Sequence, residues 1–106
     1  MKVKTSPFDA ADYLKTEQDY ALYLDLALTD ALNEDNPRIL YKALGTVARA
    51  RGMTAVAREA GISREGMYRS LSEDGNPSAD SLLKIFRALG VQLCIKPADE
   101  YTVAAN

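Results

Sequence analysis

The sequence contains no histidine and no tryptophan, and its single cysteine is Cys94. One thiol cannot form an internal disulfide, and without imidazole the chain lacks the commonest metal ligand and general base. No apolar run reaches the length of a membrane span, and residues 1–7 lack the apolar core of a signal peptide. No nucleophile–base set, metal cluster or phosphate-binding loop is visible, so an enzyme is the least favoured class. We therefore expect a cytoplasmic, cofactor-free protein without a metal site.

The net charge is small, but the charges are unevenly placed. The 106 residues carry a net charge of −2, and 47% of them are apolar, which suits one compact domain with a real core. Counted along the sequence, residues 1–37 have a balance of −5, residues 38–71 of +5 and residues 72–106 of −2. The acidic N-terminal segment lowers the expected non-specific affinity for DNA. The basic middle segment nevertheless indicates a local site for an anionic partner such as DNA.

Residues 53–71 predict two short helices joined at Gly61, a residue that favours the left-handed position at a helix end. Ser63 is a natural N-cap for the second helix, which begins at Arg64. This is the helix-turn-helix pattern, in which the second helix enters the DNA major groove. An ordinary helical hairpin in a small all-α domain is the alternative interpretation. The predicted inward-facing residues are Val56, Ala57, Ala60, Ile62, Met67 and Leu71, and the predicted outward-facing residues are Arg64, Glu65, Tyr68, Arg69 and Ser72.

Further helices are predicted on both sides of this unit, over residues 8–14, 17–32, 37–51 and 79–89. Residues 1–7 are expected to form an extended leader and residues 99–106 a loose tail. The predicted N-caps are Asp9, Thr16, Asn36 and Ser78. The predicted apolar stripes include Phe8, Ala11 and Leu14; Tyr20, Leu24, Ala27, Leu28, Ala31 and Leu32; and Leu82, Leu83, Ile85, Phe86 and Leu89.

A few residues on these helices keep two interpretations. Tyr23 and Leu26 widen the apolar surface of the helix over residues 17–32, as additional core or as a partner surface. Arg49 and Arg51 lie in the last turn of the next helix, where they favour the negative end of the dipole or lie near a phosphate backbone. Gly66 lies inside a helix at a cost of about 1 kcal/mol relative to alanine. Close approach of DNA or of the preceding helix would explain it.

Residues 91–95 alternate apolar with polar or small residues, which predicts a short β-strand before Pro97. A single strand needs a partner, either a symmetry mate in a dimer or a strand of another protein. Val91, Leu93 and Ile95 are therefore the first candidate for a dimer or partner contact, and residues 82–89 are the second.

Three stretches together resemble the addiction-module antidote proteins, which are HigA-like antitoxins of the Xre, or lambda-repressor-like, helix-turn-helix class. They are FDAADYL, ALGTVARARGMTAVAREAGISREGMYRSLSEDGNPS and LLKIFRALGVQL, within residues 8–95, and SREGMYRSLSEDGNPS is the most specific part. Ser70 departs from the pattern, which often has an aliphatic residue there. The resemblance implies a dimer that binds double-stranded operator DNA, represses its own operon and neutralises a RelE/ParE-type toxin.

The resemblance places the DNA-reading positions at Ser63, Arg64, Glu65, Tyr68 and Arg69, with Ser72 at the end of that face. Either arginine can form two hydrogen bonds to guanine O6 and N7, or contact only a phosphate. Glu65 can accept from a cytosine amino group or merely favour the helix dipole, and Tyr68 can touch a thymine methyl group or a phosphate. Outside this helix, Thr54 and the amides near it can bind a phosphate, or Thr54 can be a simple cap.

The sequence thus predicts an all-α, lambda-repressor-like domain of five helices with a helix-turn-helix. Residues 1–36 form an acidic helical extension, residues 37–90 the DNA-binding domain, and residues 91–106 a short strand and tail. The predicted function is that of an antitoxin and autorepressor, a dimer whose recognition helices lie about 34 Å apart or a multiple of that. A stand-alone Xre-type regulator without a toxin is one alternative. A protein-binding module with a vestigial helix-turn-helix, acting through its acidic N-terminal helices, is the other.

Overall fold

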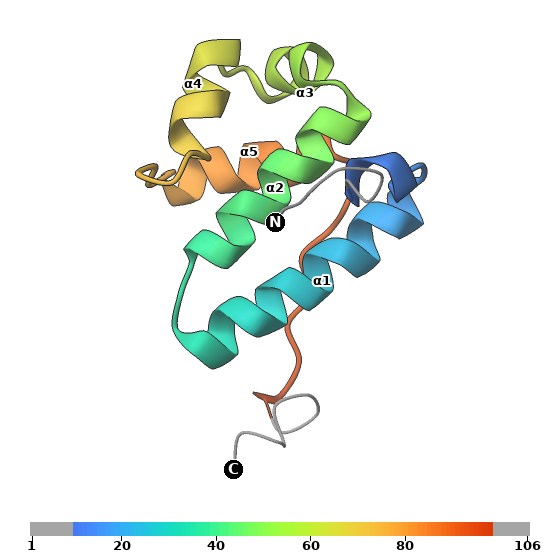
Figure 1. Ribbon diagram of the computed structural model, residues 1–106, viewed down its shortest axis with the longest axis vertical. Helices are drawn as coiled ribbons and strands as arrows, with labels where there is room; N and C mark the ends of the chain where they lie inside the picture. The colour runs from blue at the N-terminus through green and yellow to red at the C-terminus, as the bar shows by residue number, and fades with distance from the viewer. Residues whose placement is uncertain (1–9, 99–106) are drawn as a thin grey trace, which may run out of the picture.

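The computed structural model describes residues 10–98, and within them the chain is all-helical (Figure 1). A short 3₁₀ helix, η1, spans Ala10–Tyr13, and the α-helices are α1 (Glu17–Glu34), α2 (Arg38–Arg51), α3 (Met53–Ala60), α4 (Arg64–Ser70) and α5 (Ala79–Ala88). The prediction of an all-α chain is confirmed for this part. The predicted leader, tail and residues Phe8 and Asp9 lie outside the described residues.

Hydrogen bonds from side chains within a few residues fix where the helices begin. Thr16 Oγ1 accepts from the backbone N–H of Asp19 at 3.2 Å, and Asp19 Oδ2 accepts from the backbone N–H of Thr16 at 3.0 Å, which completes a capping box. The backbone N–H of Lys15 donates to the same carboxylate oxygen at 2.9 Å, and this bond, with that from Thr16, holds the pKa of Asp19 below its usual 3.8. Asn36 accepts from the N–H of Arg38 at 3.1 Å, and Ser78 caps α5 through the N–H of Ser81 at 3.0 Å. The predicted N-caps Thr16 and Ser78 are therefore confirmed, whereas Asn36 is not the N-cap of α2, because the N-cap residue is Pro37.

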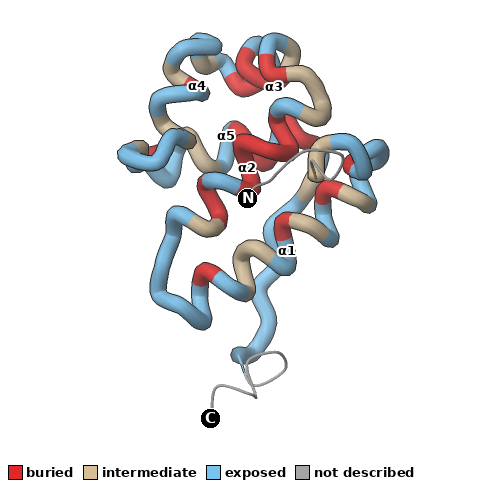
Figure 2. Tube along the Cα trace, viewed as in Figure 1, coloured by how far each residue is buried: buried red, intermediate tan, exposed pale blue. Residues whose placement is uncertain are grey.

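One core joins all five α-helices (Figure 2). α1 packs along α2, and α3 packs on both α2 and α5. The middle of α2 is buried on nearly all sides, whereas α1 buries one side only. The largest fully buried side chains come from α2, α3, α4 and α5 and the turn after α5: Leu44, Val47, Val56, Met67, Ile85 and Leu89. α3 and α4 therefore pack on the same core that holds α1.

Several apolar residues expected inside lie at the surface instead. Leu32 on α1 and Leu83 on α5 are exposed, so their assignment to the buried stripes is wrong. Leu26 is exposed as well, whereas Tyr23 packs against the core. The reason is that α1 and α5 each contact neighbours on one side only, which leaves the far side without a partner. At the N-terminal end, η1 replaces the expected helix, and Leu14 just after it is buried.

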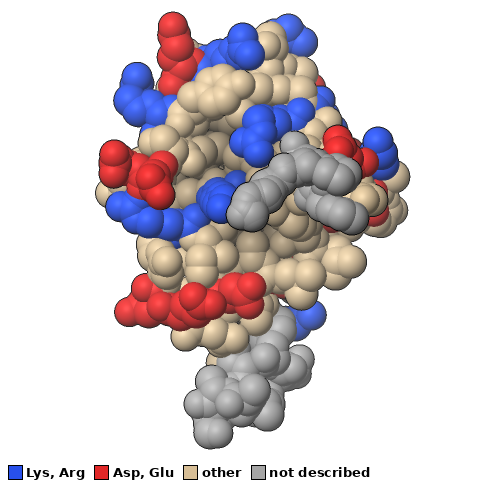
Figure 3. Space-filling model, in the orientation of Figure 1, with Lys and Arg blue, Asp and Glu red and all other residues tan. Residues whose placement is uncertain are grey.

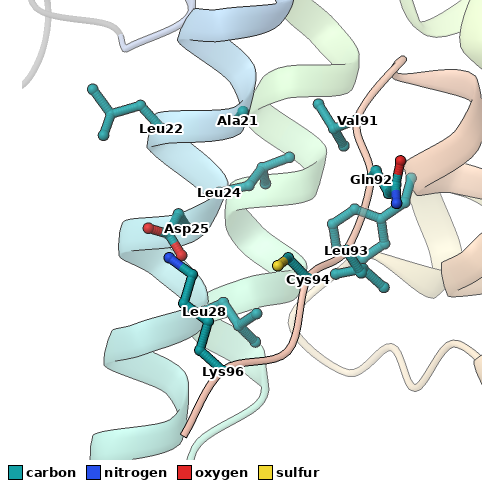
Figure 4. A pocket seen from close by; sticks show the side chains of 11 residues that line it. Ala21, Leu22, Leu24, Asp25, Leu28, Val91, Gln92, Leu93, Cys94 and Lys96 are labelled. Atoms are coloured by element: carbon teal, nitrogen blue, oxygen red, sulfur yellow. The ribbon is translucent and has the colours of Figure 1, made fainter. Parts of the chain in front are cut away.

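The predicted β-strand over residues 91–95 is wrong, because the described residues contain no strand with which it could pair. The segment instead runs beside α1 and borders a groove of about 380 Å³ (Figure 4). Leu24, Leu28 and Cys94 point toward this groove, and Val91 packs against the core. Leu93 is half-exposed and Ile95 is 97% exposed, so both are available to a partner.

Candidate nucleic-acid interface

The turn between α3 and α4 has the geometry that the sequence predicts. Gly61 adopts the left-handed backbone, with φ +72°, and the N–H of Ile62 donates to the carbonyl of Ala57 at 3.0 Å. Ser63 then caps α4, because its Oγ accepts from the backbone N–H of Gly66 at 2.9 Å. The turn thus ends α3 and starts α4 within three residues, which fixes the direction of the second helix relative to the first.

Gly66 is explained by this turn, without close approach of DNA. A Cβ at position 66 would lie 2.9 Å from Ser63 Oγ and 3.2 Å from Ile62 Cγ2. Both atoms belong to the turn, and Ser63 Oγ is held in place by its capping bond. A side chain at position 66 would therefore push against the cap that starts the helix.

The face of α4 that points away from the core carries the predicted DNA-reading residues. Met67 is fully buried beneath this helix, while Arg64, Glu65, Tyr68, Arg69 and Ser72 are exposed. The guanidinium of Arg64 lies over the ring of Tyr68, 5.6 Å from its centroid, which restricts the arginine to one side of the helix. Ser72 Oγ donates to the carbonyl of Arg69 at 2.8 Å and so occupies a carbonyl at the helix end.

Thr54 is exposed in the first turn of α3, but it is not the cap of that helix. The N-cap residue is Gly52, which has no side chain to accept from the first amides. The interpretation of Thr54 as a simple cap is therefore wrong. The N–H groups at the start of α3 are left for solvent or for an external acceptor, at the positive end of the helix dipole.

The two arginines at the end of α2 differ in their surroundings. Arg51 lies 3.3 Å from Glu59 on α3 and 3.9 Å from Glu17 on α1, and only 30% of its side chain is exposed. It therefore links three helices and is neutralised by two carboxylates, which argues against a phosphate contact. Arg49 is exposed and lies 3.5 Å from Thr46 Oγ1, so its charge faces outward.

Two exposed basic residues of α2 were not singled out from the sequence. Arg38 and Lys42 line a hollow together with Leu71 and Ser72, at the C-terminal end of α4. The helical spacing of Arg38, Lys42 and Arg49 puts all three on one side of α2, and we call them the α2 basic row. The spacing was visible in the sequence, but its position beside α4 depends on how the two helices pack.

On the face shown in Figure 3 the charges are unevenly distributed. Basic side chains gather over α2 and around α3 and α4, with a few acidic ones between them, while a band of acidic side chains covers the C-terminal end of α1. Within residues 10–98, no group of three or more His, Cys, Asp or Glu side chains is placed to hold a metal ion. None of the helices in that range has the length and hydropathy needed to cross a bilayer.

Comparison with known proteins identifies a family to which this chain is similar. The model of the family described as "Probable addiction module antidote protein" matches residues 4–97. A protein of Haemophilus influenzae (strain Rd), whose printed name is "Uncharacterized protein", is 42% identical over 96 residues, which cover 91% of this chain and 95% of that protein. No solved structure matches the chain.

Proposed function

Because the chain belongs to the family of probable addiction module antidote proteins, we propose that it is the antitoxin of a type II toxin–antitoxin module. In this proposal it acts in the cytoplasm, binds its operator DNA through α3 and α4, represses its own operon and neutralises a RelE/ParE-like toxin. One observation carries the DNA-binding half. The outer face of α4 presents Arg64, Tyr68 and Arg69 to solvent, while Met67 anchors the helix to the core and Gly61 and Ser63 fix its direction.

The proposed complex places α4 in the major groove. Arg64, in the first turn and positioned over Tyr68, donates to guanine O6 and N7, while Arg69 makes either a second base contact or a phosphate contact. Glu65 is positioned to accept from a cytosine amino group. Ser63 and Ser72 lie at the two ends of this face.

Phosphate contacts flank that face in the proposal. On one side are Thr54 and the uncapped amides at the start of α3, a favourable place for an anion. On the other side is the α2 basic row, next to the C-terminal end of α4. These contacts position the protein on DNA, and the base contacts of α4 provide the sequence preference.

Each chain has one recognition helix, so a two-fold dimer on a palindromic operator completes the proposal, with half-sites about 34 Å apart or a multiple of that. Leu93 and Ile95 remain the first candidates for the dimer contact, because they are exposed and Val91 anchors their segment to the core. The exposed Leu83 keeps α5 as the second candidate.

The test is fluorescence anisotropy with a duplex from the region upstream of the gene, a scrambled duplex of the same composition, and a series of salt concentrations. We expect Arg64→Ala to weaken binding to the upstream duplex by about 5- to 150-fold, the loss of one base contact worth about 1–3 kcal/mol. Arg87→Ala is the matched control, because Arg87 is an exposed arginine of α5 outside the proposed face. We expect it to change the affinity by less than about threefold.

Weak, strongly salt-dependent binding to both duplexes alike would contradict operator recognition and leave only non-specific electrostatics. In that case the protein-binding module with a vestigial helix-turn-helix becomes the better proposal, supported by the exposed apolar residues of α1. A stand-alone regulator shares the DNA-binding mode. It is distinguished by whether the product of a neighbouring reading frame binds this chain.

A further inference from the structure

The outer face of α1 is apolar although no part of the described chain covers it. Leu22 is 64% exposed, Leu26 58% and Leu32 67%. Leu22 and Leu26 lie one turn apart on the helix, whereas Leu32 lies about 120° round the helix from Leu26. Leu22 also lines the groove beside residues 91–96 (Figure 4), whereas Leu26 and Leu32 do not, so this face adjoins that groove. An apolar helix face of this kind on a small protein indicates a protein contact.

The charged residues of α1 itself are all acidic, and Lys96 of the segment beside it lies near Asp25 (Figure 4). Residues 16–37 contain six acidic residues and no lysine or arginine. Two of the six have a role in the fold, since Asp19 belongs to the capping box and Glu17 pairs with Arg51. Asp30 and Glu34 have no lysine or arginine within ion-pair distance among the described residues. They also lie near the C-terminal end of α1, where the helix dipole disfavours carboxylates.

These residues therefore weaken the helix that carries them, which favours a role in binding over a role in stability. The acidic charges also indicate which kind of partner could bind the outer face of α1. A second copy would bring two acidic faces together, and DNA or an anionic membrane would be repelled. A protein with basic residues around an apolar patch is the complement.

We propose that the outer face of α1 binds the toxin of the module, and that the toxin contributes a patch with an apolar centre and basic residues around it. The inference rests on the proposed function, because an antidote requires a toxin. A toxin that acts on nucleic acid must present cations to a polyanion, and Asp30 and Glu34 would pair with such cations in place of phosphates. Figure 1 shows that the C-terminal end of α1 and α4 lie at opposite ends of the molecule. The toxin would therefore leave the base-reading face of α4 uncovered, although the C-terminal end of α1 adjoins Arg38 of the α2 basic row.

The experiment uses the full-length chain and, as the probe, the purified product of the reading frame next to its gene. Binding is measured by isothermal titration calorimetry for the wild type, Asp30→Lys/Glu34→Lys and Leu22→Ser/Leu26→Ser. The matched control is Glu73→Lys/Asp74→Lys, which makes the same charge change at exposed positions after α4. We expect each α1 variant to weaken binding of the probe by about tenfold or more, and the control to change it by less than about threefold.

Two further measurements exclude simpler explanations. The thermal midpoint of Asp30→Lys/Glu34→Lys should equal or exceed that of the wild type, because lysine suits the C-terminal end of a helix. Operator binding by Leu22→Ser/Leu26→Ser should match the wild type by anisotropy, and Asp30→Lys/Glu34→Lys should bind the operator no more weakly, because its new cations lie near Arg38 of the α2 basic row. A loss of probe binding with these two properties retained supports docking on α1.

Three results would overturn the inference. Unchanged binding of the probe by both α1 variants would place the toxin elsewhere, with the proposed function intact. Conversion of a dimer to a monomer by Leu22→Ser/Leu26→Ser in sedimentation velocity would make this face a contact between copies. If the wild type binds its operator but not the probe, the toxin half of the proposed function fails together with the inference.

Discussion

Gly45 and Gly66 both lie inside helices, yet their surroundings differ. A Cβ at position 45 would lie 3.7 Å from Arg49 Nη1 and 4.0 Å from Leu71 Cβ, which is ordinary van der Waals contact. A Cβ at position 66 would lie 2.9 Å from Ser63 Oγ, the atom that caps α4. Helix propensity alone treats the two glycines alike, whereas the local geometry separates them.

We expect Gly45→Ala to raise the free energy of unfolding by about 1 kcal/mol, the propensity difference between glycine and alanine in a helix. Gly66→Ala should show little or none of this gain, because the new methyl group displaces the capping hydroxyl. Chemical denaturation followed by circular dichroism measures both variants. In a Ser63→Ala background the obstructing hydroxyl is absent, so there Gly66→Ala should recover part of the gain. Equal stabilisation by the two single substitutions would show that the cap does not constrain position 66.

At the scale of elements, the candidate interface combines two helices with different proposed tasks. The outer side chains of α4 are exposed to solvent, and the turn before this helix fixes its direction. α2 is the central helix of the core, and its basic row borders the C-terminal end of α4. This arrangement suits base contacts by α4 and phosphate contacts by α2.

The two tasks differ in their dependence on salt and on sequence. We expect Lys42→Ala to weaken binding to the upstream and scrambled duplexes by the same factor, because a phosphate contact carries no sequence information. It should also reduce the slope of log K against log salt by about 1, the value for one phosphate contact. Anisotropy over a range of salt concentrations measures both quantities. A selective loss on the upstream duplex would instead assign Lys42 to base recognition.

At the scale of the whole molecule, two of the apolar surfaces that no described residue covers differ in their charged surroundings. One is the outer face of α1, and the other is the segment with Leu93 and Ile95. They lie on either side of the groove beside residues 91–96, and only the first is bordered by Asp30 and Glu34, which have no cationic partner within residues 10–98. The difference in charge favours a basic partner for α1 and a second copy of the chain for the 91–95 segment.

The proposed dimer is tested by Leu93→Ser/Ile95→Ser in sedimentation velocity. We expect the wild type to sediment as a dimer and the variant as a monomer with weaker operator binding, because one chain supplies only one recognition helix. The thermal midpoint, measured at a concentration where the wild type is monomeric, should change little, since these side chains are largely exposed in the single chain. A variant that remains dimeric would move the dimer contact to α5, where Leu83 is exposed.

The amino-acid sequence by itself determined the features that depend on neighbours within a few residues. Thr16, Ser63 and Ser78 cap helices through bonds spanning three residues, and Gly61 supplies the left-handed backbone between α3 and α4. Helical periodicity likewise determined the all-α class and the burial of residues such as Met67. Such features need no knowledge of which helices meet.

Only the tertiary structure decided the features that depend on contacts between elements. Leu26, Leu32 and Leu83 are exposed because they lie on the sides of α1 and α5 that pack against no other helix of the described chain. Residues 91–95 have a strand-like pattern, but backbone hydrogen bonds require a second strand, and the described chain offers none. Arg51 is neutralised because folding brings it to Glu17 and Glu59, and the α2 basic row borders the candidate interface because α2 packs beside the end of α4. Sequence periodicity tells which side of a helix is apolar, and packing determines whether that side is covered.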